Sequence, residues 1–118
     1  MAGSGFGFLA VCLGAFAAHA LKDKLDAYSL GVFQTAVQYQ FFHSLALLAV
    51  GLLALTQGAD AWKGAGYCFI FGILIFSGSL YALAFTGVRV LGAITPIGGT
   101  AFLAGWILFF ISASKLAR

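Results

Sequence analysis

Residues 64–88 read GAGYCFIFGILIFSGSLYALAFTGV and contain no charged side chain. A membrane-spanning helix needs about 20 mainly apolar residues, so this stretch is long enough to cross a bilayer once. Three further uncharged stretches, residues 1–21, 27–59 and 90–114, are also long enough, and together the four hold 104 of the 118 residues. The sequence therefore predicts an all-α integral membrane protein with four spans.

The composition excludes several classes of protein. Hydrophobic residues make up 63% of the chain, charged residues 8%, and the mean hydropathy is +1.07. A soluble domain carries about 25% charged residues, so this chain cannot cover itself with a water-facing surface. The six basic residues are spread over loops and the tail, which excludes a basic patch for nucleic acid. A soluble enzyme, a nucleic-acid binder and a disordered chain are all excluded.

The predicted spans cover about residues 5–21, 39–55, 63–85 and 90–114 of a single domain, 1–118. Short connections between them predict a compact antiparallel four-helix bundle with both termini on one side. Asp26 is expected to cap a helix, and residues 27–38 read as an amphipathic segment at the membrane interface. A bend or break at Gly31 is left open. Gly58 is expected to end a helix and Asp60 to cap the next one.

The basic residues do not decide the orientation in the membrane. Three lie on the side of the termini and three on the side of the first loop: Lys63, Lys115 and Arg118 against Lys22, Lys24 and Arg89. Because the positive-inside rule compares these sides, it gives a tie. Trp62 and Tyr67 are expected at the aromatic belt near the membrane surface.

Small residues recur on the first and fourth spans. Ala10, Gly14 and Ala18 are four residues apart, as are Ala101 and Gly105. Small side chains let helix backbones approach closely in lipid, so both faces are expected to be helix contacts.

Polar residues of all four spans gather towards the side of the first loop. The candidate cluster comprises His19, Tyr39, Gln40, His43, Ser77, Tyr81 and Thr95. Polar side chains in membrane helices favour the bundle interior, so these are expected to face one another, with both histidines shallowly below the loop-side surface. Hydrogen bonds between helices are one interpretation, and a ligand, lipid-headgroup or proton site is another.

The same residues argue against catalysis and metal binding. Two histidines without a carboxylate inside the membrane are too few for a metal site. Ser77 and Ser79 have no G-x-S-x-G context. Cys12 and Cys68 lie within apolar stretches without metal or redox spacing. The sequence therefore predicts no catalytic residue, no metal and no cofactor.

Five segments resemble a known family. They are residues 13–21 (LGAFAAHAL), 32–40 (VFQTAVQYQ), 43–48 (HSLALL), 76–81 (FSGSLY) and 91–99 (LGAITPIGG). In this order they are similar to the YgdD-like small membrane proteins, a bacterial family of unknown function with eukaryotic transmembrane relatives. Ala17 departs from the family pattern, which usually has glycine there. The resemblance implies a four-span protein of the bacterial cytoplasmic membrane without an established activity.

Two functions remain as hypotheses. The first is a non-enzymatic accessory or lipid- or ligand-binding membrane component, with membrane lipids and a homo-oligomer or larger membrane complex as partners. The alternative is a small oligomeric transporter or channel that uses the cluster around His19 and His43. A transport pathway needs polar groups through both membrane halves, and the sequence places them mainly in one.

Overall fold

The structure, a computed structural model, describes residues 1–118 and consists of helices joined by short turns. α1 (Ala2–Phe16) continues into a π-helical turn, η1 (Ala17–Leu21), and α2 (Ala27–Gln57) is followed by a 3₁₀ turn, η2 (Ala59–Ala61). α3 (Lys63–Gly72), the π-helical turn η3 (Ile73–Ser77) and α4 (Gly78–Thr86) follow without interruption, and the 3₁₀ turn η4 (Arg89–Ala93) leads into α5 (Thr95–Leu116). These elements make four rods, each long and apolar enough to cross a membrane, which confirms the predicted fold class.

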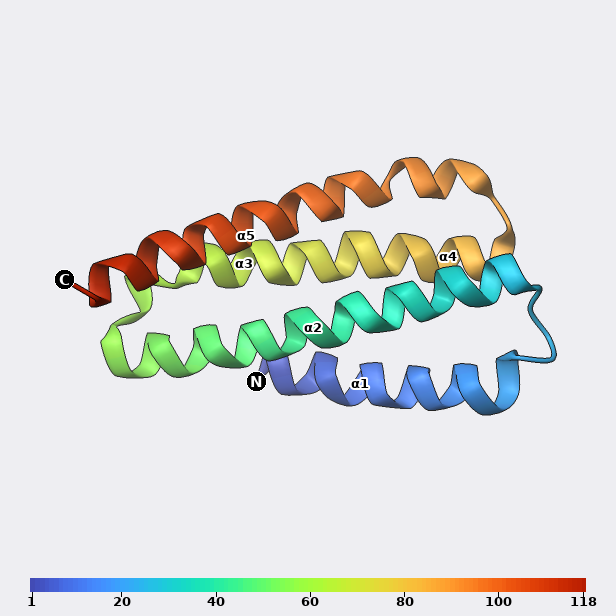
Figure 1. The fold of residues 1–118 in the computed structure, drawn as a ribbon, viewed down its shortest axis with the longest axis horizontal. Coiled ribbons are helices and arrows are strands. Elements are labelled where there is room, and N and C mark those ends of the chain that lie inside the picture. Colours follow the sequence, from blue (N-terminus) through green and yellow to red (C-terminus); the bar gives the residue numbers. More distant parts are fainter.

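The rods lie antiparallel in a flattened bundle of 52 × 27 × 18 Å (Figure 1). α1 packs along α2, α2 packs against α3 and α4, and α5 packs against α3 and η3. Each rod thus packs mainly against its neighbour in the chain. Residues 22–26 and 87–89 lie at one end of the bundle, called the loop end below, and the C-terminus lies at the opposite end.

Short-range chemistry sets where the helices begin and end. Asp26 is the N-cap of α2, and its Oδ1 accepts a hydrogen bond of 2.7 Å from the backbone N–H of Ser29, as predicted. α2 ends at Gly58, whose φ of 96° no side-chain-bearing residue adopts easily. The prediction for Asp60 is wrong. Asp60 lies in η2 and pairs with Lys63 at 2.8 Å, and α3 begins without a side-chain cap.

α2 is one continuous helix of 31 residues, without a break at Gly31. It is about 46 Å long, against a hydrocarbon core of about 30 Å, so both of its ends extend into the interface. Residues 27–38 are its first turns. Their inner side is fully buried at Phe33 and Ala36. The Phe33 ring lies 5.0 Å from that of Tyr81 and 5.6 Å from that of Phe85, so the core continues towards the loop end.

The contact face of α1 differs from the predicted one. Gly14 does face α2, since a Cβ there would lie 3.3 Å from Val37 Cγ1, but Ala18 is exposed and Ala17 is buried instead. A strict spacing of four residues rotates by about 40° at each step, so it leaves the contact face. The buried side alternates steps of three and four, as coiled-coil seams do.

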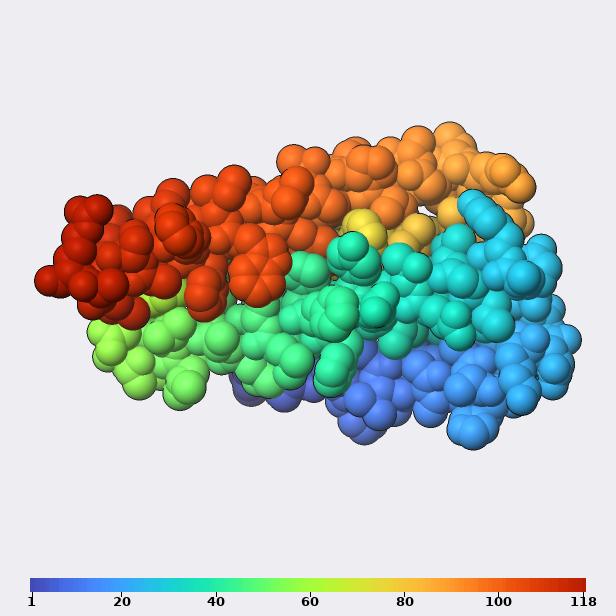
Figure 2. Space-filling model, in the orientation of Figure 1, coloured from blue at the N-terminus to red at the C-terminus, as the bar shows by residue number.

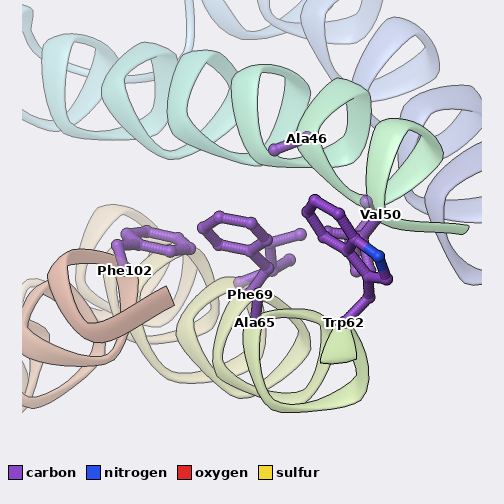
Figure 3. Close-up of a cluster of buried hydrophobic side chains, with 8 residues drawn as sticks. Ala46, Val50, Trp62, Ala65, Phe69 and Phe102 are labelled. Atoms are coloured by element: carbon purple, nitrogen blue, oxygen red, sulfur yellow. The ribbon is translucent and has the colours of Figure 1, made fainter. Parts of the chain in front are cut away.

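The main core lies between α2, α3 and α5 (Figure 3). It is built around Trp62 and Phe69, which are 1% and 0% exposed, with Val50 and Phe102 beside them. Trp62 is therefore not a lipid-facing residue of an aromatic belt, as the sequence suggested; it packs edge-on against Phe109 at 5.3 Å. Tyr67, by contrast, is 70% exposed.

Glycines set the close approach of α5 to the third rod. A Cβ on Gly98 would lie 2.7 Å from the Phe76 Cα atom, and one on Gly105 would lie 2.7 Å from the Phe69 ring. Real Cβ atoms do not come this close, so only glycine permits this spacing. The small face predicted on the fourth span is thus a helix contact at Gly105.

Candidate functional site

The middle of α2 carries the buried polar residues Gln40, His43 and Ser44. The midpoint of α2 is Phe42, so at about 1.5 Å per residue His43 lies within about 2 Å of the middle of this helix. The prediction placed His43 about one turn into the second span, whereas it lies 16 residues, about 24 Å, from the start of α2. The helix begins at Ala27, as predicted, and the depth of His43 below the membrane surface stays a prediction.

Gln40 joins three rods. Its Nε2 donates to the Phe6 carbonyl of α1 at 2.9 Å, and its Oε1 accepts from the Tyr81 hydroxyl of α4 at 2.7 Å. Both distances are those of good hydrogen bonds. Gln40 and Tyr81, two of the predicted residues, thus contact each other across the bundle.

Two buried serines, Ser77 and Ser44, form further hydrogen bonds close to Gln40. Ser77 Oγ donates to the Ala36 carbonyl of α2 at 2.8 Å, and Ser44 Oγ donates to the Gln40 carbonyl within α2. Both serines are almost completely buried. These hydrogen bonds satisfy the hydroxyls inside the protein, as buried polar groups require.

Thr95 belongs to a separate contact. Its hydroxyl lies 2.6 Å from that of Ser79, so it joins the start of α5 to α4. Neither residue forms a hydrogen bond with Gln40 or His43.

His43 uses both ring nitrogens. Nδ1 lies 2.7 Å from the Tyr39 carbonyl, and Nε2 lies 3.1 Å from Nε1 of Trp106. A carbonyl only accepts and an indole N–H only donates, so these partners assign the proton of a neutral imidazole to Nδ1. The ring also stacks on Phe102, with centroids 3.6 Å apart and planes at 11°. Geometry therefore fixes one tautomer and one orientation of His43.

A groove opens beside His43, between α2 and α5. It has a volume of about 510 Å³ and is largely lined by aromatic and small residues: Tyr39, His43, Phe76, Pro96, Gly99, Thr100, Phe102, Leu103 and Trp106. Figure 2 shows α2 in teal and α5 in orange, with atoms of the third rod visible between them. No charged side chain lines the groove.

The π-helical turn η3 supplies part of this groove. It ends in Phe76 and Ser77, which lie at the groove and in the core respectively. A π-helical turn rotates the following residues relative to an α-helix and is frequent at functional sites. Phe76 lies under Gly99, and its ring centroid is 4.6 Å from that of Tyr39. The turn thus places an aromatic side chain between α2 and α5.

His19 lies apart from the other predicted residues. It is exposed in η1, near the loop end, while its neighbours Ala17 and Leu21 are buried. A residue two positions from Ala17 lies on the other side of the helix, so His19 cannot face the same neighbours. The structure does not bring His19 and His43 together.

Of the residues that line the groove, the candidate cluster contained only Tyr39 and His43, and it missed three aromatic ones, Phe76, Phe102 and Trp106. Trp106 offered a signal, because it lies in the middle of the fourth span, away from the ends where tryptophan is enriched. The Phe76 and Phe102 side chains offered none, since phenylalanine is common throughout the chain.

Comparison with known proteins places the chain in a family. Residues 13–99 match the family model described as "Protein of unknown function (DUF423)". A UPF0382 membrane protein of Haemophilus influenzae is 52% identical over 101 residues, which are 86% of this chain and 81% of the relative. One of Staphylococcus epidermidis is 48% identical over 109 residues, 92% of this chain and 88% of the relative.

The UPF0382 inner membrane protein YgdD of Escherichia coli is 42% identical over 113 residues, which are 95% of this chain and 86% of that protein. No solved structure matches the chain. The match covers more than half of the chain and agrees with the four apolar rods. The chain is therefore an integral membrane protein that belongs to the DUF423 family of unknown function.

Proposed function

We propose that this protein is a non-enzymatic component of the cytoplasmic membrane that binds an uncharged, lipid-borne ligand in the groove between α2 and α5. The observation that carries the proposal is the aromatic lining of a groove at the middle depth of the bundle, with His43 held in one tautomer beside it. Ligand sites are typically concave, mainly apolar and provided with a few polar groups.

The hydrogen bonds around Gln40 support a structural role for the rest of the predicted cluster. Gln40, Ser77, Tyr81 and Thr95 each bond to another part of the protein. Such bonds between membrane helices contribute about 0.6 to 2 kcal/mol each. They hold the rods that form the groove, and they leave no polar track to favour a transporter.

The lining determines the chemistry of the ligand. Aromatic side chains from three rods surround the groove, and neither a cation nor a carboxylate is present to bind an ionic headgroup. The Trp106 N–H and the His43 nitrogens are already paired with protein groups. The Tyr39 hydroxyl forms no hydrogen bond within the protein, and Tyr39 is 38% exposed. An acyl or isoprenoid chain, or a neutral ring with one hydrogen-bond acceptor, fits this lining.

Filling the groove tests the proposal. Gly99 lies in the groove, and a Cβ there would be 3.8 Å from the Phe76 ring, an ordinary contact. Gly99→Leu is thus expected to occupy the groove without displacing the backbone. Gly78→Leu is the matched control, because Gly78 is exposed and nothing lies within 4 Å of its Cβ position.

The measurement is native mass spectrometry of protein purified in a mild detergent, with thermal stability recorded in parallel. The wild type and Gly78→Leu should retain a bound lipid or lipid-soluble molecule that Gly99→Leu loses. Equal retention by the Gly99→Leu and Gly78→Leu proteins, at equal stability, would contradict the proposal.

A further inference from the structure

A second feature lies on the outside of α2, away from the aromatic groove. Exposed side chains recur there at steps of four and three residues: Gln34, Gln38, Phe41, Leu45, Leu48 and Leu52. We call these six residues the α2 stripe. The spacing is that of a helix seam that faces another helix. The stripe is apolar except for its two glutamines, and it borders α1, which approaches Leu48 at Gly3.

Neither glutamine of the stripe bonds to another group of the chain. The side-chain hydrogen bonds in this part of α2 are made by Thr35 and Gln40. Gln34 and Gln38 are one turn apart, so their amides project from the same side of the helix. Each amide offers two donors and one acceptor that the single chain does not use.

The position of these two amides along α2 indicates whether they lie in the hydrocarbon core or at the membrane surface. Gln38 is four residues from Phe42, the midpoint of α2, and Gln34 is eight residues away. At about 1.5 Å per residue these separations are about 6 and 12 Å, and the hydrocarbon core extends about 15 Å from its centre. With the bilayer centred on this midpoint, both amides lie within the hydrocarbon thickness, Gln38 more deeply than Gln34. They also line the same groove as Gly14 and Ala17, which lie within the apolar span Ala2–Leu21 of the first rod. An unpaired amide in hydrocarbon is unfavourable, so pairing with a protein group is favoured.

The surroundings of the amides admit a second helix. A groove of about 460 Å³ runs along them, lined by Gly14, Ala17 and Val37 besides Gly31, Thr35 and the two glutamines. It contains no charged side chain, which argues against an anionic lipid as the occupant. Small residues let a second helix approach closely enough for amide hydrogen bonds to form.

We infer that the occupant is a second copy of this chain, bound through the α2 stripe in a two-fold symmetric dimer. A neutral amide is both donor and acceptor, so the amides of Gln34 and Gln38 are complementary to themselves. In a two-fold dimer with both chains in the same orientation, identical residues meet at the same depth. An antiparallel pair would instead set Gln38 level with apolar Ala46 and leave the amides unpaired.

Cysteine cross-linking tests the position of this interface. Phe41→Cys and Leu45→Cys keep both glutamines and are made in a background with Cys12→Ala and Cys68→Ala. Oxidation in proteoliposomes should link each of them to itself as a dimer. Phe110→Cys on α5 is the control, because Phe110 is 74% exposed, lies on another rod and does not line the aromatic groove. Cross-linking of Phe110→Cys as efficient as that of Phe41→Cys would overturn the inference.

Energy transfer between labelled chains, at varied protein-to-lipid ratios, tests the amides. An interhelical hydrogen bond changes affinity at least about threefold, so loss of two should weaken the dimer about tenfold or more. This loss is expected for Gln34→Leu/Gln38→Leu. The matched control is Gln57→Leu, at the exposed end of α2.

Three outcomes of the energy-transfer experiment overturn the inference. They are an unchanged dissociation constant for the double variant, an equal loss in Gln57→Leu, and a monomeric wild type. Self-association does not depend on ligand binding in the α2–α5 groove, so either proposal can fail while the other stands.

Discussion

Replacing Gln40 should loosen the bundle in a way that identifies its hydrogen bonds. Gln40→Leu keeps a side chain of similar length and removes the bonds to the Phe6 carbonyl and the Tyr81 hydroxyl, at 2.9 and 2.7 Å. With about 0.6 to 2 kcal/mol for each bond, the free energy of unfolding should fall by about 1 to 4 kcal/mol. The loss should be a large part of the total, because folded proteins are only marginally stable.

A double-mutant cycle separates the two bonds. Tyr81→Phe removes only the bond between α2 and α4, which Gln40→Leu also removes. The double variant should therefore lose less free energy of unfolding than the sum of the two single variants. The expected coupling is about 0.6 to 2 kcal/mol. The assay is reversible unfolding in mixed micelles followed by circular dichroism, with Gln57→Leu as an exposed control at the end of the same helix.

The reasoning would be refuted in either of two ways. Gln40→Leu could cost no more than Gln57→Leu, or its cost could simply add to that of Tyr81→Phe. Additivity would mean that the Gln40–Tyr81 bond does not stabilise the folded bundle.

Two further predictions concern the ends and faces of the rods. Gly14→Leu should lower the thermal stability in detergent more than Gly5→Leu, because a Cβ on Gly14 would crowd Val37 at 3.3 Å whereas Gly5 has open space around it; equal melting temperatures would contradict this. The backbone N–H of Ser29, together with its hydroxyl, holds the pKa of the Asp26 carboxyl below its ordinary value of 3.8. The cap should therefore stabilise α2 fully above pH 3.8 and lose this effect as pH falls through the lowered pKa, and Asp26→Asn should abolish that acid dependence in a pH series of thermal melts.

The apolar stretches predicted the four rods because the number of consecutive apolar residues alone decides whether a helix can span the hydrocarbon core. The helix start at Asp26 and the stop at Gly58 were equally local, since each depends on a few neighbouring backbone groups. The position of His43 near the middle of α2 was not a local matter, because it depended on whether the helix continued through Gly31. Nothing in the residues near Gly31 decides that question; the packing of Phe33 and Ala36 does.

The candidate cluster shows a second limit. Spacing on one helix predicts which residues share a face, and it placed Gln40 and Tyr81 in the interior. Pairing between helices depends on rotation, which a π-helical turn changes by an amount that the sequence does not reveal. Phe76 and Ser77 both lie in η3, so this turn sets the contact of Ser77 with Ala36 and the position of Phe76 beside Tyr39. His19 was misplaced because it was assigned to the cluster by its position along the first span, which does not determine the side of the helix it occupies; Ala17 and Leu21 face the interior there.

The arrangement of the rods in chain order has a consequence for how the protein is made. α1 and α2 can pair as a hairpin as soon as both have entered the membrane, and the third rod then adds to α2. Each step uses contacts with the segment inserted just before, which favours rapid and orderly assembly. Gln40 has both of its partners once α4 is inserted. The hydrogen bond of His43 Nε2 forms later, because its donor, Trp106, lies on α5, the last of the four rods to be synthesised. Until α5 is inserted, the nascent chain carries an imidazole nitrogen without its partner near the middle of α2.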